Sequence, residues 1–191
     1  MNQAFHEIRP GATYQDVLDA PRNMVAELVG GRLHLQPRPA SRHARASSVL
    51  GGKIGGPFDF DPAGPGGWWI LDEPELHLGD DVLVPDIAGW RRERMPELPD
   101  VAAFTLAPDW ICEVLSPSTR QFDLTEKRAV YAREGLANLW LVDPSARTFE
   151  VFAAHENGWS LMAALKDDDE VCQPPFEATT FNLSALWVAE S

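Results

Sequence analysis

The sequence predicts an α/β fold in which one mixed β-sheet is flanked by helices, in a single domain that spans residues 1–191. Apolar runs of strand length alternate with stretches of helical periodicity along the chain. A strand–helix–strand pattern occupies residues 109–142, and such a unit places its two strands parallel. A length of 191 residues also suits one hydrophobic core better than two.

The N-terminal part is predicted to form a short helix, a hairpin and a longer helix. Thr13 and Asp16 resemble a helix cap, so a helix is expected at about 13–20. Residues 24–36 alternate around two glycines that suit a two-residue hairpin turn. A second helix is expected from Ser41, as its cap, to about residue 56. This helix contains four glycines, and close packing against a neighbour would explain them.

The middle of the chain is predicted to contain three strands between two loops. The expected strands are 68–71, 75–78 and 82–90, and the expected loops are 61–67 and 95–108. The third strand is nearly continuous in apolar residues, which is typical of a strand buried on both faces. Asp86 interrupts it.

The C-terminal half is predicted to begin with the strand–helix–strand unit. Its strands are residues 110–115 and 139–142, and its helix is expected from Asp123, in a capping box with Glu126, to Gly135. A hairpin at 148–153 and 159–165 and a short helix near Asn182 complete the expected elements.

Charge and composition limit the classes of partner. The 16 Lys and Arg residues against 29 Asp and Glu give a formal net charge of −13, which repels nucleic acid in general. Binding of nucleic acid would need a local basic patch, and the dense candidate is Arg91, Arg92 and Arg94, which also fits a solvated loop. Two cysteines, no basic–apolar start and no run of ~18 apolar residues indicate a cytoplasmic protein without a membrane span.

Two carboxylates interrupt the two most apolar predicted strands. Burying an ionised carboxylate without a partner costs several kcal/mol, so something must hold Asp86 and Glu113. Side chains alternate along a strand, so Asp86 should share a face with Ala88, and neighbouring strands would bring both acids to one sheet edge. Oxygen ligands on rigid strands suit Mg²⁺ or Mn²⁺, which would hold a phosphate and activate water. The alternatives are an ion pair with Arg or Lys and a protonated carboxyl.

Several segments together resemble the Uma2 family of restriction-endonuclease-like proteins, over about residues 14–159. They are Val84-Pro85-Asp86-Ile87, Cys112-Glu113-Val114-Leu115-Ser116-Pro117-Ser118-Thr119, Lys127, Tyr131, Gly135 and Leu139-Trp140-Leu141-Val142-Asp143-Pro144. The resemblance implies a PD-(D/E)xK nuclease core, with Asp86 and Glu113 as catalytic metal ligands and Glu27 as a further acid. One departure is that Leu115 stands where the superfamily pattern has a lysine. Lys127 matches the lysine of the Uma2 pattern and would supply the missing cation.

The spacing of Lys127 and Tyr131 places them on one helix face, from which both could reach Glu113. The alternative for Lys127 is an exposed side chain that covers apolar surface. Glu27 could equally lie on the wet face of its hairpin. A phosphate contact and a surface position are both open to His43, and the surface position is favoured.

Other chemistry-bearing residues fit structural roles. Ser116 and Ser118 have no nucleophile elbow around them and are expected in a turn. The tryptophans beside apolar strands could stack on bases, but a place in the core is favoured; these are Trp68, Trp69, Trp90 and Trp110.

The expected function is therefore that of a Mg²⁺- or Mn²⁺-dependent endonuclease that hydrolyses phosphodiester bonds. The expected partner is DNA, and the sequence is compatible with a homodimer. The rival is a catalytically silent scaffold or nucleic-acid-binding module that keeps the fold. The net charge of −13 favours this rival.

Overall fold

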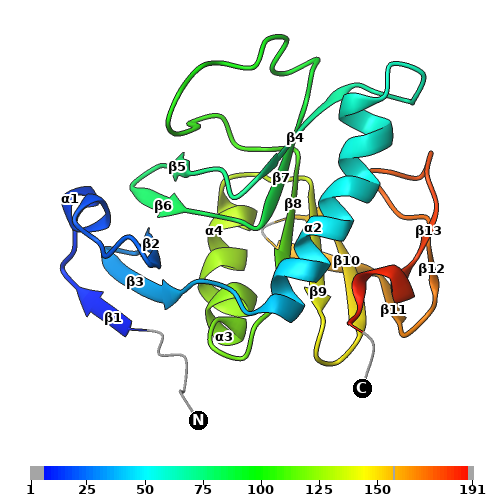
Figure 1. The fold of residues 1–191 in the computed structure, drawn as a ribbon. Coiled ribbons are helices and arrows are strands. Elements are labelled where there is room, and N and C mark those ends of the chain that lie inside the picture. Colours follow the sequence, from blue (N-terminus) through cyan, green and yellow to red (C-terminus); the bar gives the residue numbers. More distant parts are fainter. Residues whose placement is uncertain (1–6, 157, 189–191) are drawn as a thin grey trace.

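The computed structural model describes residues 7–156 and 158–188. Six of the strands in this part of the chain form the central sheet (Figure 1). Their order is β11 (Gly158–Lys166), β10 (Thr148–His155), β9 (Asn138–Asp143), β8 (Trp110–Val114), β7 (Ile87–Arg91) and β4 (Trp68–Asp72). A second sheet has the order β1 (Glu7–Pro10), β3 (Arg32–Pro37), β2 (Met24–Val29), β6 (Asp81–Leu83) and β5 (Leu76–Leu78). A small pair is formed by β12 (Glu170–Val171) and β13 (Phe181–Asn182).

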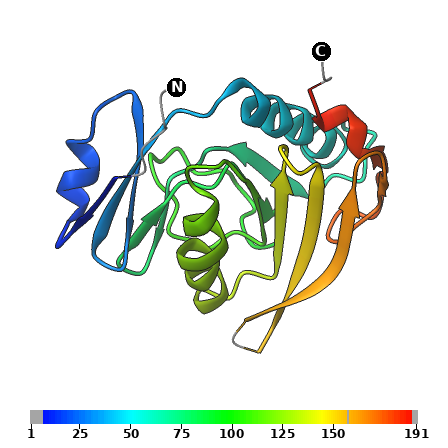
Figure 2. The same cartoon turned by 90° about the horizontal axis from the view of Figure 1, so that it is seen from below.

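The central sheet is mixed, as the sequence predicts. β8 and β9 pair in parallel, from Trp110 opposite Asn138 to Val114 opposite Val142, whereas the other neighbouring pairs of this sheet are antiparallel. The predicted strand–helix–strand unit is therefore confirmed. Figure 2 shows helix α2 (Ser41–Gly55) over one face of the sheet and helix α4 (Arg128–Arg133) against the other.

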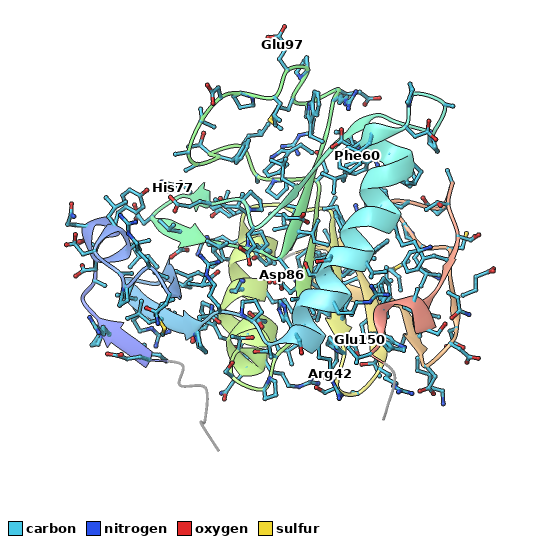
Figure 3. The ribbon with its side chains drawn as sticks, in the orientation of Figure 1. Arg42, Phe60, His77, Asp86, Glu97 and Glu150 are labelled. Atoms are coloured by element: carbon cyan, nitrogen blue, oxygen red, sulfur yellow. The ribbon has the colours of Figure 1, made fainter. Side chains whose placement is uncertain are left out.

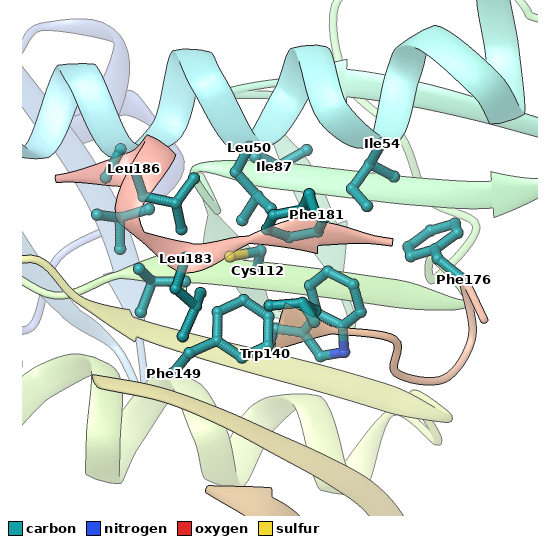
Figure 4. Close-up of a cluster of buried hydrophobic side chains, with 14 of the residues drawn as sticks. Leu50, Ile54, Ile87, Cys112, Trp140, Phe149, Phe176, Phe181, Leu183 and Leu186 are labelled. Carbon is teal, nitrogen blue, oxygen red and sulfur yellow. The ribbon is translucent and has the colours of Figure 1, made fainter. Parts of the chain in front are cut away.

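Each face of the central sheet carries its own apolar core. Because side chains alternate along a strand, β9 sends Trp140 and Val142 to one core and Leu139 and Leu141 to the other. The first core packs against α2 and the 3-10 helix η3 (Leu183–Leu186), as Figure 4 shows. The second core packs against α4. Burial on both faces explains why β8 and β9 read as continuous apolar runs.

The predicted N-terminal elements are present. Helix α1 (Tyr14–Leu18) follows Thr13, whose backbone and hydroxyl both donate to Asp16. Gly30 and Gly31 have φ angles of 58° and 70° and form the turn between β2 and β3. α2 begins at Ser41, but Ala40 occupies its cap position without a side-chain bond, so the predicted capping role of Ser41 is wrong. The π-helical turn η1 (Gly56–Phe60) continues α2.

The predicted strand at 82–90 is wrong. Residues 81–83 form β6 in the second sheet and residues 87–91 form β7 in the central sheet, so the chain crosses between the sheets at residues 84–86. Pro85 lies in this crossing, where its missing N–H breaks no ladder bond. Asp86 therefore precedes β7 instead of sharing a strand face with Ala88.

The helix of the strand–helix–strand unit begins earlier than predicted. It consists of α3 (Arg120–Phe122), the π-helical turn η2 (Asp123–Lys127) and α4, and it ends before Gly135, whose φ is 73°. Asp123 thus lies inside the helix and does not cap it. The end at Gly135 and the strand that follows are confirmed.

No helix in residues 7–156 and 158–188 is long and apolar enough to cross a membrane. The first six residues, on which the expectation about an export signal depends, lie outside the described part of the chain.

Candidate functional site

A pocket of about 740 Å³ opens where the two sheets approach the first turn of α2. Its walls come from the end of β3, the start of α2, the crossing at residues 84–86, the end of β8 and the turn that follows it. Three predicted site residues line it, namely Asp86, Glu113 and Lys127. Figure 3 shows Asp86 near the centre of the molecule, beside the ribbon of α2.

Lys127 is buried at the base of this pocket, with 3% of its side chain exposed. Its Nζ lies 2.8 Å from Glu113 Oε1 and 3.0 Å from Glu27 Oε1. The carbonyl oxygen of Val84 lies 3.3 Å from the same nitrogen. An ammonium has three protons, so three acceptors occupy its donor capacity. The alternative of an exposed lysine is wrong.

The positive charge beside Glu113 comes from Lys127 in the helix and not from residue 115. Leu115 is buried in the core that packs against α4. Lys127 and Tyr131 both contact Glu113 Oε1, and the tyrosine hydroxyl donates to it at 2.5 Å. Their predicted common orientation toward Glu113 is therefore confirmed.

Glu27 supports Lys127 from behind the pocket. Its side chain is fully buried, so the wet-face alternative is wrong. Glu27 Oε1 accepts the Val84 N–H at 2.8 Å, and Oε2 accepts a bond from the Gln36 amide. Because the Glu27 carboxylate contacts both Lys127 and the crossing segment, it fixes the position of the Lys127 ammonium.

Asp86 is held in place by a backbone amide and by a histidine. Its Oδ2 accepts the N–H of Val114, the residue after Glu113, at 2.7 Å. Its Oδ1 lies 3.1 Å from His43 Nε2, and only 11% of the His43 side chain is exposed, so the expected surface position of His43 is wrong. Burial alone would lower the pKa of His43, but the hydrogen bond and the charge of Asp86 raise it above its ordinary value.

Asp123 is a site residue that sequence reasoning missed. Its side chain is buried and lines the pocket, with Oδ1 3.7 Å from Lys127 Nζ and Oδ2 accepting the Thr119 hydroxyl at 2.7 Å. Burial raises the pKa of Asp123 to about 7, although Lys127 opposes this. Its position four residues before Lys127 was the available signal, since such residues share a helix face.

Comparison with known proteins identifies the family. Residues 12–185 match the model of the Uma2 family, described as "Putative restriction endonuclease". The chain belongs to the Uma2 family. A solved structure, titled as a putative nuclease belonging to DUF820 from Anabaena variabilis, is similar with a TM-score of 0.74. The two chains are 23% identical, and the match covers 92% of this chain and 97% of the other, which shows a shared fold. No curated protein matches the chain.

The family and the fold together support a restriction-endonuclease-like nuclease, and the fold class expected from the resemblance is confirmed. The cluster in this Uma2 protein carries excess negative charge. Its four acids are Glu27, Asp86, Glu113 and Asp123, against Lys127 and His43. Burial raises the pKa of Glu113 well above its ordinary value; Lys127 opposes this rise, and the neighbouring acids add to it. A proton or a divalent cation would relieve this repulsion.

The donors at the pocket fit Mg²⁺ or Mn²⁺ in chemistry. Asp86 and Glu113 supply hard carboxylate oxygens at its wall. Within the described residues, no group of three or more His, Cys, Asp or Glu side chains could hold a metal ion. Mg²⁺ commonly keeps several waters and takes one or two carboxylates together with substrate phosphates, so two protein carboxylates are sufficient.

The candidate basic patch of the Uma2 protein lies away from the pocket. Asp86 precedes β7, whereas Arg91 is its last residue and Arg92 and Arg94 come after it, so the arginines lie at the opposite end of that strand. Arg92 pairs with Asp59 at 2.7 Å and Arg94 with Asp109 at 3.0 Å. The favoured core position is confirmed for three of the tryptophans, which are Trp68, Trp90 and Trp110. Trp69 is partly buried, and its indole N–H donates to the Met95 carbonyl.

Proposed function

We propose that this Uma2 protein is a Mg²⁺- or Mn²⁺-dependent endonuclease that hydrolyses phosphodiester bonds of DNA. The observation that carries the proposal is the meeting of Asp86 and Glu113 at one pocket, with the buried Lys127 in contact with Glu113. Action in the cytoplasm is part of the proposal, because the two cysteines of the chain are unpaired.

Asp86 and Glu113 would hold the cation in this proposal. The bound cation would stabilise charge on a phosphate and lower the pKa of an attacking water. The N–H of Val114 and the ring of His43 fix the orientation of the Asp86 carboxylate. This preorganisation matters because a ligand that must reorient loses part of its effect on the transition state.

Lys127 would act as a fixed positive charge and not as a base. Burial alone would lower its pKa, but the charges of Glu113 and Glu27 outweigh burial and raise the pKa well above its ordinary value. The ammonium therefore stays protonated at neutral pH. A permanent charge beside the proposed metal ligand would stabilise negative charge that develops on the phosphate.

The rival function, a silent nucleic-acid-binding module, has one specific observation in its favour. Glu27, Glu113 and Val84 together occupy the three protons of Lys127, so no proton is directed at a substrate in this state. The two functions differ in a measurable way, because a silent module would bind DNA and leave it intact.

Cleavage of plasmid DNA in Mn²⁺ tests the proposal. We expect wild-type protein to nick the plasmid, and Asp86→Asn and Glu113→Gln to lower the rate by about 10²–10³-fold or more. Glu97→Gln is a matched control, since Glu97 is an exposed acid on the loop far from Asp86 (Figure 3). Wild-type protein that binds DNA but leaves it intact would support the silent module.

Metal binding is measured separately from cleavage by thermal melting across a Mn²⁺ series. A ligand at a hundredfold excess over its Kd stabilises a protein by ~2.7 kcal/mol. For a chain of this size, that corresponds to a rise of roughly 5–10 °C in Tm. The rise should be absent in Asp86→Asn; equal responses in both proteins would show that Asp86 is not a ligand.

A further inference from the structure

Arg38 forms an ion pair at the rim of the pocket. It lies between β3 and α2, and its Nη1 is 3.2 Å from Oε2 of Glu73 in the connection between β4 and β5. Both residues line the pocket, yet 56% of the Arg38 side chain and 44% of the Glu73 side chain are exposed. The pair thus connects two segments at the open side of the site.

Arg38 differs from the other basic residues of the pocket wall, which are Lys127 and His43. Lys127 is buried with three acceptors, and His43 contacts Asp86. An exposed guanidinium has five N–H donors, so it can reach a ligand in solvent. In a chain of net charge −13, this local cation is what an approaching polyanion would meet at the site.

Glu73 is fixed relative to the proposed metal ligand. Its backbone N–H donates to the carbonyl oxygen of Asp86 at 3.1 Å. Its φ of 46° lies in the left-handed region, which residues other than glycine rarely adopt. A residue held in such a conformation by its surroundings is often part of a functional site. Glu73 therefore connects Arg38, which its side chain contacts, to the backbone of Asp86.

Exchange of the Arg38 partner should require little free energy. Exposed ion pairs contribute little to stability because water screens them and because both side chains lose freedom. A phosphate accepts two parallel N–H bonds from a guanidinium, so it is a stronger partner than the single contact made by Glu73.

We propose that Arg38 binds a phosphate of the DNA backbone next to the bond that is cleaved, and that Glu73 holds Arg38 until DNA displaces it. This inference rests on the proposed nuclease function. It assigns Glu73 a competing role: the same carboxylate that positions Arg38 also opposes binding of the phosphate.

The test is equilibrium binding of a short fluorescein-labelled DNA duplex in Ca²⁺, over a series of salt concentrations. Arg38→Gln should weaken binding by about tenfold, as loss of a charged hydrogen bond does, and lower the salt slope by ~0.9 for one phosphate. Glu73→Gln should tighten binding. In the double variant, Glu73→Gln should have no further effect, because it acts through Arg38.

Two controls remove the same charges elsewhere. Arg9→Gln takes an arginine from another exposed ion pair, and Glu97→Gln takes an acid from the loop far from Asp86 (Figure 3). Both should bind DNA as wild type does. Arg38→Lys should recover part of the affinity, since the charge returns without the planar pair of donors.

The outcomes separate this inference from the proposed function. Wild-type protein that binds and cleaves DNA, with Arg38→Gln equal to Arg9→Gln, would overturn the role of Arg38 alone. Weaker binding by Glu73→Gln would also overturn it, since a purely structural ion pair predicts losses from both substitutions. Wild-type protein that neither binds nor cleaves DNA would overturn the proposed function, and the inference with it.

Discussion

At the scale of single residues, the site is organised around one buried lysine that lies close to several carboxylates. Lys127 Nζ contacts Glu113 and Glu27 and lies 3.7 Å from Asp123 Oδ1. Removing one partner of a buried ion pair leaves an uncompensated charge, which costs more than the pair itself contributes. Lys127 is therefore expected to matter for stability as well as for catalysis.

We expect Lys127→Met to lower the free energy of unfolding of the metal-free protein by about 3–5 kcal/mol at pH 7, because it strands buried carboxylates. Urea denaturation measures this change. Lys53→Met is the matched control, since Lys53 is exposed on α2 and its loss should change stability by less than ~0.5 kcal/mol. Equal midpoints for both variants would show that the carboxylates do not depend on Lys127.

The sequence predicted part of this cluster and missed the rest for a physical reason. Asp86 and Glu113 stand out because a charge in an apolar run is rare. The position of Lys127 came from the family resemblance, since its own spacing also fits an exposed lysine. His43 and Asp123 occur in polar surroundings in the sequence, so their burial follows only from the packing of distant segments.

At the scale of elements, local patterns predicted the strand–helix–strand unit but not the crossing between the sheets. β8 and β9 are recognisable because each is an apolar run that ends at turn residues. The run at 82–90 is apolar whether it forms one strand or two, and Pro85 was the signal that it is broken. The site lies at this break, because the crossing gives Asp86 access to the pocket.

The four glycines at the end of α2 and the start of η1 differ in what surrounds them. A Cβ at position 51 would lie 3.0 Å from Asp72 Oδ1, and one at position 55 would lie 2.9 Å from the Phe60 ring. At positions 52 and 56, a Cβ would meet nothing within 4 Å. The expectation of close packing is therefore confirmed for Gly51 and Gly55 and wrong for Gly52 and Gly56.

This difference predicts opposite results for neighbouring substitutions. Gly52→Ala should raise the free energy of unfolding by roughly 0.5–1 kcal/mol, because alanine favours the helix and has room for its methyl group. Gly51→Ala should gain less or lose stability, because the Asp72 carboxylate must move. Chemical denaturation of both variants measures the sign. Equal gains in the two variants would show that the Asp72 carboxylate moves without a cost in free energy.

At the scale of the whole molecule, the site joins the two sheets. Glu27 lies in β2 of the second sheet and Glu113 in β8 of the central sheet, and Lys127 contacts both. Loss of either sheet would leave a buried charge without its partner. We therefore propose that the chain is one domain, with both sheets unfolding in one cooperative transition.

The same cluster sets how stability depends on pH. The pKa of Asp123 is about 7 in the folded protein against 3.8 in the ordinary state, so between these values the folded chain holds a proton that the unfolded chain releases. Stability should consequently fall as the pH rises from about 4 to about 7, by on the order of 2–4 kcal/mol for this group. Below pH 4 both states are protonated, and the effect ends. The raised pKa of Glu113 acts in the same direction.

Asp123→Asn tests this account, because an amide keeps an acceptor for the Thr119 hydroxyl but cannot ionise. Urea denaturation of the metal-free protein at several values between pH 4 and pH 7 should give a flatter dependence for Asp123→Asn than for the wild type. The variant should also be the more stable of the two at pH 7, where the wild-type carboxyl begins to ionise. Asp100→Asn, which removes an exposed acid, should leave the slope unchanged. Parallel curves for Asp123→Asn and the wild type would show that Lys127 keeps the Asp123 carboxylate ionised throughout this range, and that the excess charge of the cluster is relieved at another of its acids.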